Sequence, residues 1–149
     1  MRVVIVSSLL LSVGTAQALD LSSLARPGVT WKTAKAKTAD VTCDGKADTV
    51  VFGTGKKSIW VGIVPGDGGK PQAMRFGLDS GSQDGFCAVP KSIEVYPINC
   101  AAAADGLGIA HLPGCKAVKG CRAFAVGEEC DPFNFYWDSR RKRMEWWRN

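Results

Sequence analysis

The sequence predicts an all-β fold, a small antiparallel sheet, sandwich or partly open barrel that is held together by disulfides. The 17 glycines and 7 prolines divide the 149-residue chain into short segments, which is typical of a β domain with many turns. Apart from short Ala-rich patches, apolar positions after residue 18 do not recur every three or four residues, so helical periodicity is nearly absent. Several short runs are instead rich in β-branched and aromatic residues.

Residues 1–18 have the three parts of a secretory signal peptide. Arg2 supplies a positive charge, VVIVSSLLLSVG is apolar, and Ala16-Gln17-Ala18 has small residues where a signal peptidase cuts. The apolar run is shorter than the roughly 20 residues that a membrane-spanning helix needs. We therefore expect cleavage after Ala18, one mature domain at 19–149, a periplasmic or secreted protein and no membrane-spanning segment. A buried N-terminal element is the alternative.

All six cysteines lie between Cys43 and Cys130. An even number of cysteines in an exported chain indicates disulfides, and the absence of a C-x-x-C pair disfavours zinc. Six cysteines allow about 15 connectivities. We expect Cys43 to pair with Cys87, and Cys121 to pair with Cys130 or Cys115.

The remaining elements follow from local pattern. We expect strands at 29–32, with Trp31 as an anchor, at 49–52 and at 58–64, the most apolar run. A Gly-rich turn at 66–69 precedes an antiparallel strand at 73–78, and further strands are expected at 92–98 and 122–126. Residues 99–114 are Ala- and Gly-rich, which favours a loop with one helical turn.

The clearest local signal is a C-terminal β-hairpin. Phe133, Phe135 and Trp137 alternate with Asn134 and Tyr136, a turn begins at Asp138-Ser139, and 144–147 forms the returning strand. The sequence therefore predicts a hairpin with one aromatic face.

The most specific segment is DVTCDGKADTVVFG, which begins at Asp40. Oxygen-bearing side chains stand at its first, third, fifth and ninth positions, as Asp40, Thr42, Asp44 and Asp48, and glycine stands at the sixth. Alternate side chains of a tight loop converge on one point, where the backbone carbonyl of Lys46 would join them, and calcium takes about six to eight oxygen ligands. The pattern predicts a structural calcium site. The alternative is a turn held by its own side chain-to-backbone hydrogen bonds.

The same segment resembles the calcium loop and following strand of FG-GAP or VCBS-type repeats, which read close to D-x-[DN]-G-D-G-x-x-D. The resemblance implies calcium and an extracytoplasmic module. It covers about a tenth of the chain and occurs once, whereas such repeats form propellers of several blades, so it predicts no propeller here. Thr42 replaces a carboxylate or amide of the family pattern, and Cys43 replaces a glycine.

Basic and aromatic residues gather at the C-terminus of a chain with a net charge of +5. We take as candidate binding residues Arg140, Arg141, Lys142, Arg143, Trp147 and Arg148. Such groups pair with sulfates, phosphates and carboxylates or stack on flat rings. The cluster predicts a surface for a protein, an anionic glycan or a lipid head group, and export disfavours nucleic acid. The alternative is a solvated turn with one of Trp146 and Trp147 in the core, since neighbouring strand residues face opposite sides.

The sequence carries no catalytic motif. His111 is the only histidine, and no G-x-S-x-G, phosphate loop or dinucleotide fingerprint occurs. We therefore predict an exported, monomeric binding or interaction module rather than an enzyme. One alternative is a small hydrolase, which needs a pocket where acidic side chains converge. The other is a protein inhibitor with a disulfide-braced loop at 115–130.

Overall fold

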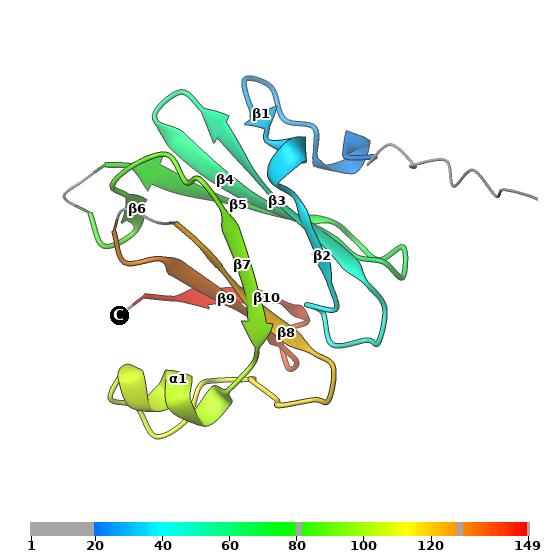
Figure 1. Ribbon diagram of the computed structural model, residues 1–149, viewed down its shortest axis with the longest axis vertical. Coiled ribbons are helices and arrows are strands. Elements are labelled where there is room, and N and C mark those ends of the chain that lie inside the picture. The colour runs from blue at the N-terminus through cyan, green and yellow to red at the C-terminus, as the bar shows by residue number, and fades with distance from the viewer. Residues whose placement is uncertain (1–19, 80–81, 128–129, 149) are drawn as a thin grey trace, which may run out of the picture.

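Two β-sheets packed face to face form the protein (Figure 1). The computed structural model describes residues 20–79, 82–127 and 130–148, so the predicted signal peptide lies outside the described residues. Within those ranges neither sheet closes into a barrel, and the all-β, disulfide-linked fold is confirmed. No helix in the same ranges is long and apolar enough to cross a membrane.

Sheet A has six strands: β1 (Thr30–Trp31), β2 (Lys37–Ala39), β3 (Asp48–Gly55), β4 (Ser58–Val64), β5 (Gln72–Leu78) and β6 (Gly85–Phe86). They follow the order β1-β3-β4-β5-β6, and β2 also pairs with β3. Two 3-10 turns, η1 (Ser22–Leu24) and η2 (Thr33–Lys35), flank β1. β6 runs parallel to β5, so sheet A is mixed rather than purely antiparallel.

Trp31 anchors the outer face of sheet A. Its ring lies over Gly53 and Gly62, where an added Cβ would stand 2.9 and 3.0 Å from indole carbons. Its Nε1 donates to the carbonyl oxygen of Leu24 at 3.1 Å. The two glycines therefore leave the space into which the tryptophan fits.

Sheet B has four antiparallel strands in the order β10-β9-β8-β7: β7 (Ile93–Pro97), β8 (Arg122–Val126), β9 (Phe133–Asp138) and β10 (Arg143–Trp147). β9 and β10 form the hairpin that the sequence predicts, with 139–142 as its turn. Phe133, Phe135 and Trp137 share the face toward sheet A, and Trp137 pairs with Met144. The aromatic row thus runs along the core toward the hairpin turn.

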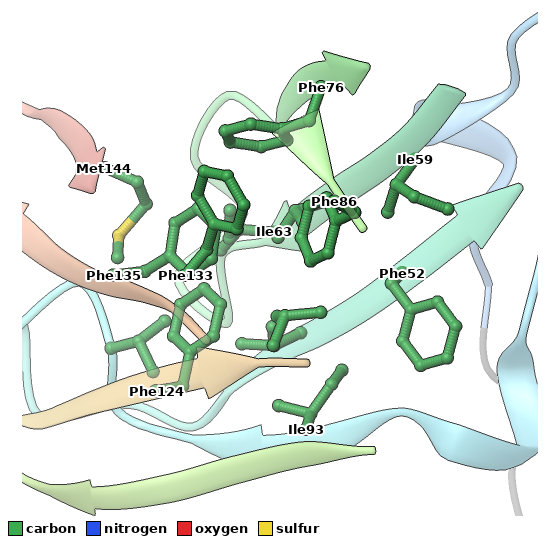
Figure 2. Close-up of a cluster of buried hydrophobic side chains, with 14 residues drawn as sticks. Phe52, Ile59, Ile63, Phe76, Phe86, Ile93, Phe124, Phe133, Phe135 and Met144 are labelled. Atoms are coloured by element: carbon green, nitrogen blue, oxygen red, sulfur yellow. The ribbon is translucent and has the colours of Figure 1, made fainter. Parts of the chain in front are cut away.

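The main core lies between the two sheets. Figure 2 shows Phe52 and Ile63 of sheet A in one cluster with Ile93, Phe124 and Phe135 of sheet B. The Phe124 and Phe135 rings stack with centroids 4.8 Å apart and planes 9° apart. Burying a side chain of this size stabilises the fold by roughly 1.5–3 kcal/mol. The core therefore explains why the sheets stay together.

The helix α1 (Cys100–Gly106) covers the outer face of sheet B and lies below that sheet in Figure 1. The side chain of Asn99 caps it by accepting the Ala102 N–H at 3.0 Å. α1 and the loop after it pack on a second cluster that includes Ala104, Leu112, Ala123, Tyr136 and Trp147. The sequence predicts only one helical turn here, because seven residues are too few to show a helical period.

Three disulfides pair all six cysteines: Cys43–Cys121, Cys87–Cys130 and Cys100–Cys115. The predicted partners, Cys87 for Cys43 and Cys130 or Cys115 for Cys121, are wrong.

Strand packing explains the first bond. β8 begins beside the end of β2, where the Arg122 N–H donates to the carbonyl oxygen of Asp40 at 2.8 Å. This contact brings Cys121 next to Cys43 across a sequence separation of 78 residues. The number of residues between two cysteines therefore does not predict which cysteines pair. The bond ties sheet A to sheet B at the edge where the candidate site lies.

Candidate functional site

The Asp40–Asp48 loop is organised around the carboxylate of Asp48, which is fully buried. Its Oδ2 accepts the Val41 and Thr42 N–H groups, both at 2.8 Å, and its Oδ1 accepts the Gly66 N–H at 2.9 Å. The Thr42 hydroxyl donates to Oδ1 at 3.4 Å. A carboxylate offers about four acceptor positions, so protein donors occupy all of those on Asp48.

The rest of the loop is held in the same way. Asp40 accepts the N–H groups of Asp44 at 3.1 Å and Gly45 at 2.9 Å, and Asp44 accepts that of Lys46 at 2.7 Å. Gly45 has a φ of 85°, which explains the glycine at the sixth position. The loop is therefore held by hydrogen bonds from its own backbone to its own side chains.

The geometry of Asp48 does not fit a calcium ligand, because a metal ion would have to displace its N–H donors. Across the described ranges no group of three or more His, Cys, Asp or Glu side chains is arranged to hold a metal. The calcium prediction now depends on the carboxylates of Asp40, which is half-buried, and Asp44, which is exposed. The FG-GAP resemblance also stays a prediction.

The hairpin turn is built on Asp138, which is buried. Its Oδ1 accepts the N–H groups of Arg140 at 2.8 Å and Arg141 at 3.0 Å, and its carbonyl oxygen accepts that of Lys142 at 2.9 Å. Burial raises the pKa of Asp138, but the two N–H groups and the charges of Arg141 and Arg140 outweigh it and hold that pKa below its ordinary value. A charged Asp138 thus fixes the turn.

Three of the candidate arginines have partners within the protein. Glu145 Oε1 accepts from Arg141 Nη1 at 3.0 Å and from Arg143 Nε at 2.7 Å. Arg148 donates to the carbonyl oxygen of Gly85 at 3.0 Å, and its guanidinium lies 5.0 Å from the centre of the Phe133 ring. Arg140 and Lys142 are exposed. The basic residues near the C-terminus therefore differ in the structure: three arginines have partners within the protein, whereas Arg140 and Lys142 are exposed.

The neighbouring tryptophans face opposite sides, as the alternation predicts. Trp146 lies at the core margin against Phe76 and Phe133 and is 36% exposed. Trp147 packs against Tyr136 under α1 and is 9% exposed. The predicted binding residue Trp147 therefore has little ring surface left for a ligand.

A cleft of about 700 Å³ opens where the 40–48 loop, the β4–β5 turn, the segment after Cys115 and the hairpin meet. Its lining includes the polar residues Thr42, Asp44, Asp67, Lys70, Gln72, Lys116, Ser139, Lys142 and Arg143 and the apolar residues Pro65, Pro71, Val118 and Trp137. Cys43, whose disulfide joins the two sheets, also lines it. The volume lies within the roughly 300–1,000 Å³ of small-molecule sites.

Positive charges from three separate segments meet in this cleft. Lys70 follows β4, Lys116 follows the Cys100–Cys115 disulfide, and Lys142 lies in the hairpin turn; all three are exposed. In the part of the chain that the structure describes, no salt bridge neutralises any of them. The nearby Arg143 is instead paired with Glu145. The cleft therefore presents three ammonium groups to solvent.

Trp137 supplies the aromatic surface of the cleft. It ends the row that Phe133 and Phe135 begin, so it packs against the core and also lines the cleft. Its neighbour Ser139 is fixed by donating its hydroxyl to the carbonyl oxygen of Gly114 at 2.8 Å. The cleft thus has an apolar wall beside its exposed lysine side chains.

Sequence reasoning found only Thr42, Asp44, Lys142 and Arg143 of this lining. Lys70 and Lys116 lack a local signal, because only the fold brings them near the hairpin. A second, smaller cavity of about 370 Å³ is lined by Lys32, Lys35, Phe52, Pro90 and Lys91. His111 lines neither cavity.

The disulfides also bear on the inhibitor alternative. Cys130 bonds to Cys87 and Cys115 bonds to Cys100, so no disulfide joins the two ends of the 115–130 segment. The shortest segment that a disulfide closes is 100–115, on which Ile109 is exposed.

Comparison of the chain with protein-family models, curated proteins and solved structures finds no match.

Proposed function

We propose that this protein is an exported binding module that holds an anionic ligand in the cleft beside the C-terminal hairpin. The convergence of Lys70, Lys116 and Lys142 on one cleft supports the proposal most directly. The three ammonium groups outnumber the two carboxylates of Asp44 and Asp67 in the same cleft, and the excess positive charge attracts an anion. The pairing of all six cysteines supports export, since disulfides persist in oxidising compartments.

Retention on a resin that carries a sulfated polysaccharide tests this function. We expect the triple variant Lys70→Gln, Lys116→Gln, Lys142→Gln to elute at a lower salt concentration than the native protein. The matched control is Lys37→Gln, Lys56→Gln, Lys57→Gln, which removes the same charge from exposed lysines outside the cleft. Equal elution of the two variants would show that net charge, not the cleft, holds the polyanion, and would contradict the proposal.

Hydrolysis is the second candidate, because Asp44 and Asp67 line the same cleft. Two carboxylates are the minimum for general acid–base hydrolysis of a glycoside. Each, however, holds its own loop by accepting a backbone N–H two residues on, from Lys46 at 2.7 Å and Gly69 at 2.6 Å. Binding is therefore the better-supported function. Hydrolysis of a bound ligand that Asp44→Asn and Asp67→Asn each abolish would establish the enzyme instead.

A further inference from the structure

The cleft carries two kinds of charged group. The ammonium groups of Lys70, Lys116 and Lys142 share it with the carboxylates of Asp44 and Asp67. A ligand that has only negative groups, such as a phosphate chain, is attracted by the lysines but repelled by both aspartates. A ligand that has acid groups and hydroxyls satisfies both, because its hydroxyls donate to the carboxylates.

The apolar part of the lining points to the same class of ligand. Trp137, Pro65 and Pro71 give the cleft flat hydrocarbon surfaces. The C–H face of a pyranose ring packs on such surfaces, and an amphipathic indole contributes a large apolar area there. The free cations are lysines, which act as point charges and do not require the fixed geometry that an arginine fork imposes.

We propose that the ligand is an acidic oligosaccharide, with a sugar ring on Trp137, its acid groups at the lysines and its hydroxyls at the aspartates. This inference rests on the proposed function, that is, on anion binding in the cleft. It excludes polyphosphates and acidic peptides as preferred ligands, since neither combines few charges with many hydroxyl donors.

The backbone of Lys142 supports a binding role for its side chain. Its φ of 54° lies in the left-handed region, which residues with a Cβ avoid and which a turn normally gives to glycine. A lysine here costs stability, and this lysine lines the cleft. Lys57, with a φ of 53° in the β3–β4 turn, has the same conformation but does not line the cleft. It is therefore a matched control.

Calorimetric titration with three probes tests the proposal: trigalacturonate, a neutral trisaccharide of the same length, and inorganic tripolyphosphate. We expect the dissociation constant of trigalacturonate to be at least tenfold lower than those of the neutral trisaccharide and of tripolyphosphate. Lys142→Gly should weaken trigalacturonate binding at least threefold, and Lys57→Gly should leave it unchanged. Both variants should raise the melting temperature by about 2 °C, because each relieves the same backbone strain.

The variant Asp67→Asn distinguishes recognition of an acidic oligosaccharide from attraction of any anion by the lysines. The amide oxygen can still accept the Gly69 N–H, so the turn is preserved. We expect this variant to bind trigalacturonate less tightly and tripolyphosphate more tightly. The oligosaccharide proposal would be overturned if the variant bound both ligands more tightly, or if the native protein bound trigalacturonate and tripolyphosphate equally well. Anion binding in the cleft would stand in either case. If trigalacturonate does not bind, the oligosaccharide proposal fails, and equal resin retention of the two triple variants would overturn the proposed function as well.

Discussion

The backbone N–H of Lys142 donates to the carbonyl oxygen of Asp138 at 2.9 Å, and this hydrogen bond closes the turn that carries Lys142 into the cleft. Asp138 also accepts the N–H groups of Arg140 and Arg141 through its side chain. Asp138 therefore holds the hairpin turn through its buried carboxylate and positions Lys142 through its backbone carbonyl oxygen.

Replacing Asp138 with asparagine is expected to destabilise the fold by about 1–3 kcal/mol, because a charge-assisted acceptor becomes a neutral one. The folded-state pKa of Asp138 is lowered, so its contribution to stability is present above its ordinary pKa and is lost as pH falls through the folded value. Denaturant unfolding from neutral pH into acid measures both effects. The variant should lose part of the acid dependence, whereas the exposed control Asp131→Asn should keep it. An unchanged acid dependence in Asp138→Asn would contradict the role given to this carboxylate.

The disulfides are expected to differ in their contribution to stability. Replacing Cys43 and Cys121 with serine opens a closed loop of 78 residues, against 15 for Cys100 and Cys115. Loop entropy predicts losses of about 4.5 and about 3 kcal/mol respectively. Denaturant unfolding of the two double variants tests the order. A larger loss from the Cys100–Cys115 variant would contradict the assignment of α1 as an attachment to sheet B rather than part of the main core.

Both tyrosines of the chain are expected to resist ionisation. Burial and, to a smaller extent, the charge of Glu94 raise the pKa of Tyr96 to about 12. Burial also raises that of Tyr136, with Glu145 and Asp138 adding to it. Stability from a raised pKa is fully present below the ordinary value of 10.0 and is lost as pH rises toward the folded value.

Ultraviolet difference absorbance measures tyrosinate directly. At pH 10 the folded protein should show far less than half of the tyrosinate signal of the denatured chain. Tyr96→Phe removes a 2.7 Å hydrogen bond to Asn134 and should flatten the alkaline loss of stability. Half-ionisation of both tyrosines near pH 10 in the folded state would contradict their burial.

The hydrogen bonds of the 40–48 loop predict a small response to calcium. Because protein donors occupy Asp48, we expect millimolar calcium to shift the melting temperature by less than about 1 °C relative to chelator. Asp48→Asn should destabilise the protein equally with and without calcium, by about 3 kcal/mol, since two buried N–H groups lose a charged acceptor. A larger calcium-dependent rise that Asp44→Ala abolishes would establish the site that the sequence pattern predicts.

The strands that the sequence predicts with the correct bounds are those whose side chains are mostly buried. β4 is a continuous apolar run, and β8 has four buried residues of five, so burial and pattern agree. β2 reads Lys-Thr-Ala, lies at an edge and is mostly exposed, and therefore has no apolar alternation to detect. β6 has two residues and forms only through its parallel contact with β5.

The candidate site is less predictable than the fold, because its residues are neighbours only in three dimensions. Lys142 and Arg143 stand out in a basic run, but Lys70 and Lys116 lie outside any such run, in loops. The sequence suggests Trp147 as a binding residue, but α1 covers it in the structure. The sequence does not reveal this because α1 shows no helical period. The Cys43–Cys121 pairing that brings the walls of the cleft together depends on how the sheets pack.

The proposed acidic oligosaccharide binds in the cleft against Trp137. The most direct measurement follows the indole N–H signals of the five tryptophans in nitrogen–proton correlation spectra during titration with trigalacturonate, with Trp137→Phe used for assignment. We expect the Trp137 signal to move in a saturable way while those of Trp31 and Trp147 stay in place. Shifts confined to other tryptophans, or a Trp137 signal that does not move at saturating ligand, would contradict binding of the sugar at Trp137.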